Sequence, residues 1–329
     1  MDLSEIKYCP GTLAYGFSTY SRTCLKRVFN GRAVSHILPY YSPTFNSQTD
    51  ELFEQNRKLM SISGVQEKFS IRLEGNKLKL VTEGERGTHI LKPIPSAGRI
   101  PDQMPANEHV TMQIARQVYN IETAENALIF FKDGTTAYIT KRFDVHEDGS
   151  KIAQDDFASL AGRTPQTHGE HYKYLGNYLE LFRIMQTYLS TYKLEALKLF
   201  KLLVFNYLFS NGDAHLKNFS IIETPMGDYR LSPAYDLLNS HIHVNDKPFA
   251  LHDGLFPQSL AKGKMYSQFA VLAETVGISS KIFRNIMDDM LSNSIKVENM
   301  ISASFLNETT KRNYFQSYQR RLKRLNYQK

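Results

Sequence analysis

The sequence predicts an α+β protein of two lobes, a small β-rich lobe followed by a larger all-helical lobe. Three observations predict this fold. The length of 329 residues exceeds the size at which a single hydrophobic core keeps growing. Residues 61–145 contain runs of alternating apolar and polar residues separated by glycine-containing turns. Beyond about residue 150, apolar residues recur at helical spacing.

Composition changes divide the chain into three expected segments. Residues 1–60 are rich in Tyr, Ser, Arg and Pro, and we expect a short extension packed on the first lobe, with one helix at 50–60. Residues 61–145 form the β-rich lobe. Residues 146–329 form the helical lobe, which includes a polar loop and a basic C-terminus.

The expected elements follow in order. Alternation over 69–84 with Gly75-Asn76 at its centre predicts a hairpin. The segment 88–93 predicts a strand, 94–105 with its three prolines a loop, and 105–120 an amphipathic helix. The remaining expected elements are a second hairpin around 132–134, helices at 172–189 and 194–209, short strands at 219–223 and 229–233, and helices at 268–277, 281–295 and the C-terminus.

Composition and cysteine usage indicate a cytoplasmic protein. The start MDLSEIKY is polar and acidic, unlike a secretory signal. The longest apolar run, 201–209, is too short to span a bilayer and contains Lys201 and Asn206. Cys9 and Cys24 form no C-x-x-C pair and no disulfide framework, which suits a reducing compartment.

Positive charge is concentrated at the C-terminus. The formal net charge is +7, and residues 311–329 carry seven Lys or Arg and no acid. This segment is either a solvated basic helix face or a contact for an acidic partner, including nucleic acid held by a partner. The sequence does not separate the two.

The polar stretch 210–222, SNGDAHLKNFSII, follows the most apolar predicted helix. Asp213 and Asn218 have the spacing D-x-x-x-x-N of a kinase catalytic loop, in which the Asp is the base and the Asn binds magnesium. The alternative is a polar turn that ends the helix.

Further candidate residues occur in the order that phosphoryl transfer requires. SISGVQEK at 61–68 precedes the first hairpin, where a phosphate-covering loop is expected, and Lys92 lies in a strand. Glu108 opens the next helix as a possible ion-pair partner of Lys92, and Asp236 follows a strand as a second magnesium ligand. Each has an ordinary alternative: a surface lysine, an acid favoured by the helix dipole, or a turn residue.

The segments SISGVQEKFSIRL, THILKP, NEHVTMQIAR, YITKRFDV, FNYLFSNGDAHLKNFSII and LSPAYDLL together resemble the HipA family of serine/threonine kinases, toxins of bacterial toxin–antitoxin modules. The resemblance covers roughly residues 60–325 and implies a two-lobed protein-kinase-like fold. It is closest to the short HipT type, whose partners are the small protein HipS and the DNA-binding antitoxin HipB. It therefore implies contact with DNA only through the HipB-like partner, and no membrane.

The resemblance implies roles for individual residues. Asp213 would be the base, His215 and Lys217 would line the catalytic loop, and Asn218 and Asp236 would hold Mg²⁺. Ser61 and Ser63 match inhibitory autophosphorylation positions, where a phosphate would repel ATP from its loop. The implied ATP-binding residues are Ser63, Gly64, Val65, Gln66, Glu67, Lys68, Lys92, Lys141, Arg142, Phe143, His215, Lys217, Asn218, Tyr235 and Asp236.

One residue departs from the family pattern. Lys141 stands in the adenine hinge where HipA has an acid, so a side-chain contact to adenine from this position is in doubt, whereas main-chain contacts are expected to remain.

The family's substrates imply transfer of the ATP γ-phosphate to a serine of an aminoacyl-tRNA synthetase, with the tryptophanyl enzyme expected first. Translation and growth would stop, the state linked to persistence. Two other functions stay open: a phosphoinositide-type lipid kinase, and a non-catalytic subunit of a repressor complex. A metal hydrolase is disfavoured because no further His pair has ligand spacing.

Overall fold

The computed structural model describes residues 3–43, 67–82, 85–146, 149–245, 247–257 and 259–326. The helix expected at 50–60 lies outside these residues. The chain divides into two compact units. Unit 1 consists of residues 1–113, 124–151 and 299–311, and unit 2 consists of residues 114–123, 152–298 and 312–329.

Unit 1 is built on a five-stranded antiparallel sheet in the order β2-β1-β3-β5-β4. The hairpin at Gly75-Asn76 is confirmed, since Glu74 and Lys77 pair across a two-residue turn and Gly75 has φ 56°. The expected strand at 88–93 and the second hairpin are also present. The strands are β1 Phe69–Glu74, β2 Lys77–Leu80, β3 His89–Lys92, β4 Asn126–Phe130 and β5 Thr136–Lys141.

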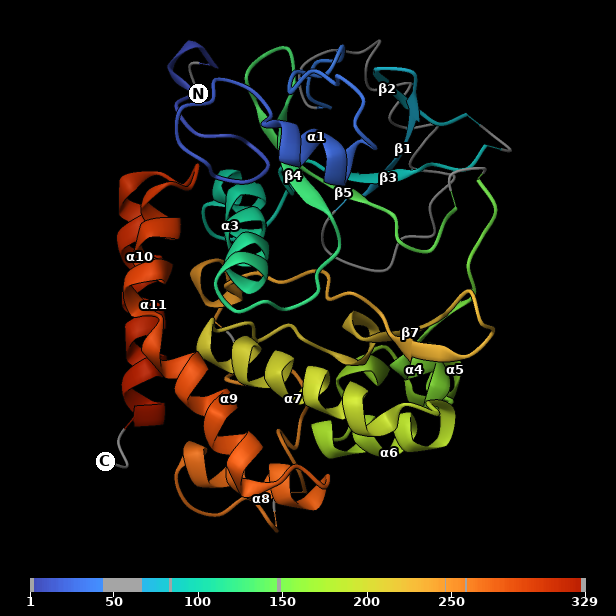
Figure 1. Cartoon of the computed structure of the whole chain (residues 1–329), viewed down its shortest axis with the longest axis vertical. Helices are drawn as coiled ribbons and strands as arrows, with labels where there is room; N and C mark the ends of the chain where they lie inside the picture. The colour runs from blue at the N-terminus through green and yellow to red at the C-terminus, as the bar shows by residue number, and fades with distance from the viewer. Residues whose placement is uncertain are drawn as a thin grey trace. The chain divides into compact units, whose positions relative to one another are not determined.

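Two helices of this region flank the sheet (Figure 1). Helix α1, Arg22–Val28, begins at Ser21, whose side chain accepts the N–H of Cys24. Helix α3, Met104–Gln117, matches the expected helix at 105–120, and the 3-10 turn η2, Pro101–Gln103, precedes it. One apolar core joins residues of the N-terminal segment to the sheet, among them Cys9, Phe29, Phe69, Leu91 and Ile139.

Unit 2 is mainly helical but contains a three-stranded sheet in the order β6-β7-β8. The strands are β6 Gln154–Asp156, β7 Ser220–Glu223 and β8 Tyr229–Leu231. The expectation of an all-helical second lobe is therefore wrong. Strand β6 has no apolar alternation because it is only the polar tripeptide Gln-Asp-Asp, held by pairing with β7.

The helices after residue 150 differ from expectation mainly at their ends. The helix expected from 172 begins at 178, because Gly176 has φ 84° and interrupts the pattern after the 3-10 turn η3, Tyr172–Tyr174. The expected helix at 281–295 ends at Ser292, and a new helix begins at Ser294. The bounds are η1 Leu3–Glu5, α4 Phe157–Leu160, α5 Pro165–His168, η3 Tyr172–Tyr174, α6 Tyr178–Tyr188, α7 Tyr192–Leu208, η4 Leu216–Asn218, η5 Ser240–Ile242, α8 Met265–Thr275, α9 Ser280–Ser292, α10 Ser294–Ser302 and α11 Glu308–Asn326.

Helix α7 is the central helix of unit 2, as its apolar sequence predicted. Leu199, Phe200, Leu203 and Phe205 on it are fully buried, and α6 lies beside it (Figure 1). Among the described residues, no helix combines the length and apolar character needed to cross a bilayer.

Candidate functional site

The polar stretch after α7 is a loop held in place at its start by internal hydrogen bonds. Ser210 has φ 53°, so the chain turns sharply where the helix ends. Asn211 donates its main-chain N–H to the Asn206 carbonyl at 2.9 Å and its side-chain amide to Asn206 Oδ1 at 3.1 Å. The Gly212 N–H donates to Ser240 Oγ at 2.7 Å. These first residues therefore form the turn that ends the helix and leave the following polar residues for other roles.

Asp213 is half-buried and accepts a hydrogen bond from a tyrosine. The Tyr174 hydroxyl donates to Asp213 Oδ1 at 2.9 Å. The Asp213 N–H donates to Asn211 Oδ1 at 3.3 Å, which fixes the backbone of the proposed base. No pattern in the sequence indicated Tyr174, because it lies 39 residues earlier in the chain.

His215 is buried next to Asp213 and is neutral. Burial lowers the pKa of His215 to about 4, although the nearby carboxylates of Asp213 and Asp236 favour its protonated form. Its Nδ1 has no hydrogen-bond partner within the described part of the chain, and its ring makes an edge contact with Tyr174 at 5.2 Å. The carboxylates of Asp213 and Asp236 thus both act on the same buried imidazole.

Lys217 is paired with the start of α4. Its ammonium lies 2.9 Å from Asp156 Oδ2, while Asp156 Oδ1 accepts the N–H of Ser159 and caps the helix. The Lys217 carbonyl accepts the Tyr235 hydroxyl at 2.9 Å. Tyr235 thus connects the loop to the segment that carries Asp236. Sequence reasoning missed Asp156, which lies in the unpredicted β6–α4 region.

Asn218 and Asp236 supply oxygen atoms of the kind that Mg²⁺ prefers. Asn218 ends η4, and Asp236 follows β8 in the left-handed conformation at φ 55°; both are half-buried. The described residues contain no group of three or more His, Cys, Asp or Glu placed to hold a metal. A pair of protein ligands fits Mg²⁺ that takes its remaining ligands from substrate phosphates and water, but does not form a metal site on its own.

In unit 1, Lys92 and Glu108 form the ion pair that the sequence suggested. Lys92 Nζ on β3 lies 2.6 Å from Glu108 Oε1 on α3, and the side chains are 3% and 2% exposed. The ammonium also lies 5.3 Å from the centre of the Tyr138 ring. The alternative of a surface lysine is therefore wrong, because the residue is buried and paired.

The expected hinge residues use much of their hydrogen-bonding capacity within unit 1. Lys141 Nζ lies 2.5 Å from Asn30 Oδ1, and the Lys141 N–H donates to the Glu125 carbonyl at 2.7 Å. The Arg142 main-chain N–H donates to the Thr88 carbonyl, and the Arg142 guanidinium lies 2.6 Å from Asp144 Oδ2. The main-chain N–H groups of 141 and 142 thus donate to acceptors within unit 1.

The predicted phosphate-covering loop falls mostly outside the described residues. Ser61, Ser63, Gly64, Val65 and Gln66 lie outside them. The described chain resumes at Glu67 and Lys68, directly before β1.

The basic C-terminal helix α11 is only partly solvated. Arg312, Arg320, Lys323 and Arg324 are exposed. Arg321, in contrast, is buried, donates from Nε to Ser210 Oγ at 3.2 Å, and stacks over Tyr207 at 4.8 Å. At least one of the seven basic residues therefore supports the loop that carries Asp213.

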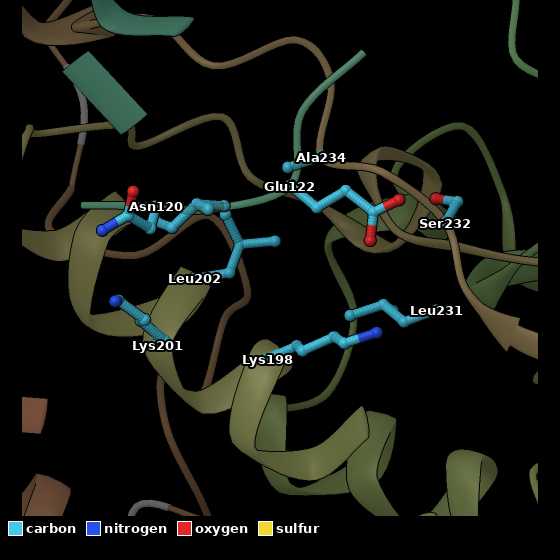
Figure 2. Close-up of a pocket in the computed structure, with 9 residues that line it drawn as sticks. Asn120, Glu122, Lys198, Lys201, Leu202, Leu231, Ser232 and Ala234 are labelled. Carbon is cyan, nitrogen blue, oxygen red and sulfur yellow. The ribbon is translucent and has the colours of Figure 1, made fainter. Parts of the chain in front are cut away.

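A separate pocket of about 120 Å³ lies within unit 2 (Figure 2). It adjoins Ala234, which lies two residues before Asp236. The Ala234 N–H donates to the Glu122 carbonyl at 2.8 Å. Its charged groups are paired within the protein: Lys198 with Glu195, Lys201 with Asp289 and Glu122 with Arg230. None of the predicted site residues lines it. The lining residues are Asn120, Ile121, Glu122, Lys198, Lys201, Leu202, Leu231, Ser232 and Ala234.

Comparison with known proteins gives one family. The model of the HipA-like C-terminal domain matches residues 60–297. A Haemophilus influenzae protein described as a putative kinase is 24% identical over 297 residues, which is 83% of each chain. The putative kinase Y4dM of Sinorhizobium fredii is 32% identical over 59% of this chain and 48% of its own length. The putative kinase Y4mE of the same organism is 30% identical over 57% and 44%, respectively.

A solved structure shows the same fold. HipA in the Shewanella oneidensis complex of HipA, HipB and operator DNA has a TM-score of 0.64 at 20% identity, over 80% of this chain and 65% of that chain. The chain thus spans about half the length of the two Sinorhizobium relatives and 65% of that HipA chain.

The mixed α and β structure, with its antiparallel sheet and a helical region, has a HipA-like fold. Because the family model covers most of the chain, the protein belongs to the HipA-like family.

Proposed function

We propose that the protein is an ATP-dependent serine/threonine kinase. The observation that carries the proposal is the buried Lys92–Glu108 ion pair at 2.6 Å between a strand and a helix. Burying two charges costs desolvation free energy, so such a pair is a poor way to stabilise a fold. It is, however, the arrangement that kinases use to direct a lysine at nucleotide phosphates. The similarity to proteins described as putative kinases supports the same conclusion.

In this proposal each candidate residue has one task. Asp213 accepts the proton of the acceptor hydroxyl, and Lys92 contacts the ATP phosphates. Asn218 and Asp236 would hold Mg²⁺, which neutralises charge on the phosphates when it is bound. Neutral His215 is buried next to Asp213. Lys217 pairs with Asp156 and so holds the loop against α4.

The finer assignments rest on the family resemblance. We propose a toxin of the HipT type, with HipS-like and HipB-like partners and a synthetase serine as substrate. The solved HipA relative was crystallised with HipB and operator DNA, which supports the HipB-like partner. Autophosphorylation at Ser61 or Ser63 would regulate the kinase, because a phosphate adds about −1.5 to −2 of charge beside the ATP phosphates.

The test is phosphate transfer from γ-labelled ATP to purified aminoacyl-tRNA synthetases, with the tryptophanyl enzyme among them. Intact-mass measurement of the protein alone reports autophosphorylation in the same experiment. The Asp213→Asn variant is the control and should transfer nothing, since it lacks the base. Absence of transfer to any synthetase would remove the substrate proposal. Equal labelling by wild type and Asp213→Asn would remove the base assignment.

A further inference from the structure

The hydroxyl of Tyr174 occupies a position on Asp213 that an acceptor hydroxyl would need. Its distance of 2.9 Å from Asp213 Oδ1 lies within the range of about 2.6–3.2 Å that a general base takes to the proton it removes. Tyr174 donates this bond, as an acceptor hydroxyl would. The contact lies wholly within unit 2.

The backbone around Tyr174 is fixed on its C-terminal side. The Tyr174 carbonyl accepts the His252 N–H at 2.9 Å, and the Gly176 carbonyl accepts the Asp253 N–H at 3.0 Å. Arg163 donates to the Leu175 carbonyl at 2.6 Å. The preceding residues 164–171 are exposed throughout. The phenol can therefore leave Asp213 by side-chain rotation, while the backbone that follows stays in place.

The surroundings of the Tyr174 side chain keep its hydroxyl protonated, so that it remains a hydrogen-bond donor to Asp213. Burial raises the pKa of Tyr174 above its ordinary value, and the Asp213 carboxylate raises it further. The ring is only half-buried, with the edge contact to His215 on one side and Lys173 Nζ at 5.1 Å from its centre. A neutral, half-exposed phenol is a donor that a second hydroxyl can replace.

We propose that Tyr174 gates the base: its hydroxyl blocks Asp213 at rest and moves away when an acceptor hydroxyl binds. The proposal rests on the proposed kinase function. After exchange, the acceptor oxygen bonds to the γ-phosphorus, the bond from that phosphorus to the β–γ bridging oxygen breaks, and ADP leaves. The acceptor proton passes to the Asp213 carboxylate. Because the phenol occupies the site on Asp213 Oδ1 that a water molecule would otherwise use, the gate slows ATP hydrolysis when no protein acceptor is present.

The test is the Tyr174→Phe variant, which keeps the ring contact with His215 and loses only the hydroxyl. ADP release from ATP with Mg²⁺ and no protein acceptor should rise about tenfold in kcat, a barrier lower by about 1.4 kcal/mol. The KM for ATP should not change. The control is Tyr188→Phe, an exposed tyrosine at the end of α6, which should match wild type. A packing role for the hydroxyl would lower the rate, so an unchanged or lower rate overturns the gate.

A second measurement tests the hydrogen bond without any activity. In protein labelled with [¹³Cζ]tyrosine, the Tyr174 resonance is identified by its absence in Tyr174→Phe. Asp213→Asn should lower the pKa of Tyr174 towards its ordinary value, because the carboxylate that raises it is gone. If the titration is the same in Asp213→Asn and wild type, the gate is wrong. If it shifts but wild type neither hydrolyses ATP nor autophosphorylates, the kinase proposal fails and the contact stands.

Phosphotyrosine analysis closes the remaining alternative. A hydroxyl bonded to the base could itself be the acceptor, in which case tryptic mass spectrometry after incubation with ATP would find phosphate on Tyr174. That result would overturn the gate and make Tyr174 a substrate. Unmodified Tyr174 together with faster hydrolysis in Tyr174→Phe supports the gate.

Discussion

Lys92 and Glu108 form a deeply buried ion pair, and their burial determines what each substitution does. Removing one partner leaves an uncompensated charge in an apolar environment, whereas removing both leaves only a change of shape. The two effects separate the contribution of the pair to folding from its contribution to catalysis.

We therefore expect Lys92→Met to destabilise the protein by about 3–5 kcal/mol, because Glu108 is left charged and buried. The double variant Lys92→Met, Glu108→Leu should recover most of this loss, since both sites are then apolar. Urea unfolding followed by circular dichroism measures the free energies of unfolding.

Activity should not follow stability in this pair of variants. Both should lack phosphate transfer, because neither has a cation at position 92. A double variant that is stable and active would show that the pair is structural and that Lys92 does not contact ATP.

At the scale of elements, helix α11 supports the loop that follows α7. Arg321 and Ser317 on α11 both reach the hydroxyl of Ser210, at 3.2 Å and 3.1 Å, and Ser210 lies three residues before Asp213. The sequence predicts α11 as a charged surface helix. Its contacts with Ser210 show that it also helps to position the candidate base.

We expect Arg321→Ala to lower kcat by about tenfold, since small displacements of catalytic groups have large effects on rate. The KM for ATP should change little. Arg320→Ala is the matched control, because it removes the same charge from an exposed neighbour and should leave kcat unchanged. The kinetics of ATP turnover measure both constants. Equal effects of the two substitutions would show that only net charge matters.

Elements with strong local signals could be predicted from the sequence. The glycine-centred hairpin at 75–76, helix α3 and the apolar helix α7 were each indicated by periodicity or turn chemistry and are present. Strand β6 could not be predicted, because its three polar residues are ordered by pairing with β7, in which Ser220 pairs with Asp156 from 64 residues further along the chain. The same reason applies to Tyr174, whose contact with Asp213 depends on the tertiary fold alone.

Within the candidate site, the ion pair of Lys92 and Glu108 could be predicted from the sequence. Sequence order and spacing indicated Lys92, Glu108, Asp213 and Asp236, and the structure pairs the first two. Spacing could not show that the N–H groups of 141 and 142 are used internally, because their acceptors come from other parts of unit 1.

At the scale of the whole molecule, both units contain buried neutral histidines. His89 and His109 in unit 1 and His215 in unit 2 each have a pKa lowered to about 4, in every case mainly by burial. His89 Nε2 lies 2.8 Å from the Val28 carbonyl, and His109 Nε2 lies 3.2 Å from the Gly11 carbonyl, so each ring bridges separate segments. Protonation of these rings is therefore opposed in the folded state and not in the unfolded state.

This difference predicts that stability falls on acidification between about pH 6.5 and pH 4. In that window the unfolded chain binds protons at these histidines and the folded chain does not, so each histidine contributes stability above pH 6.5 that is lost as pH falls to 4. A shift of this size corresponds to roughly 3 kcal/mol per histidine. Urea unfolding at pH 7.5, 6.5, 5.5 and 4.5 measures it. His109→Leu should flatten the dependence, whereas His168→Gln, at an exposed histidine, should not. An unchanged slope in His109→Leu would show that His109 binds its proton equally well in both states.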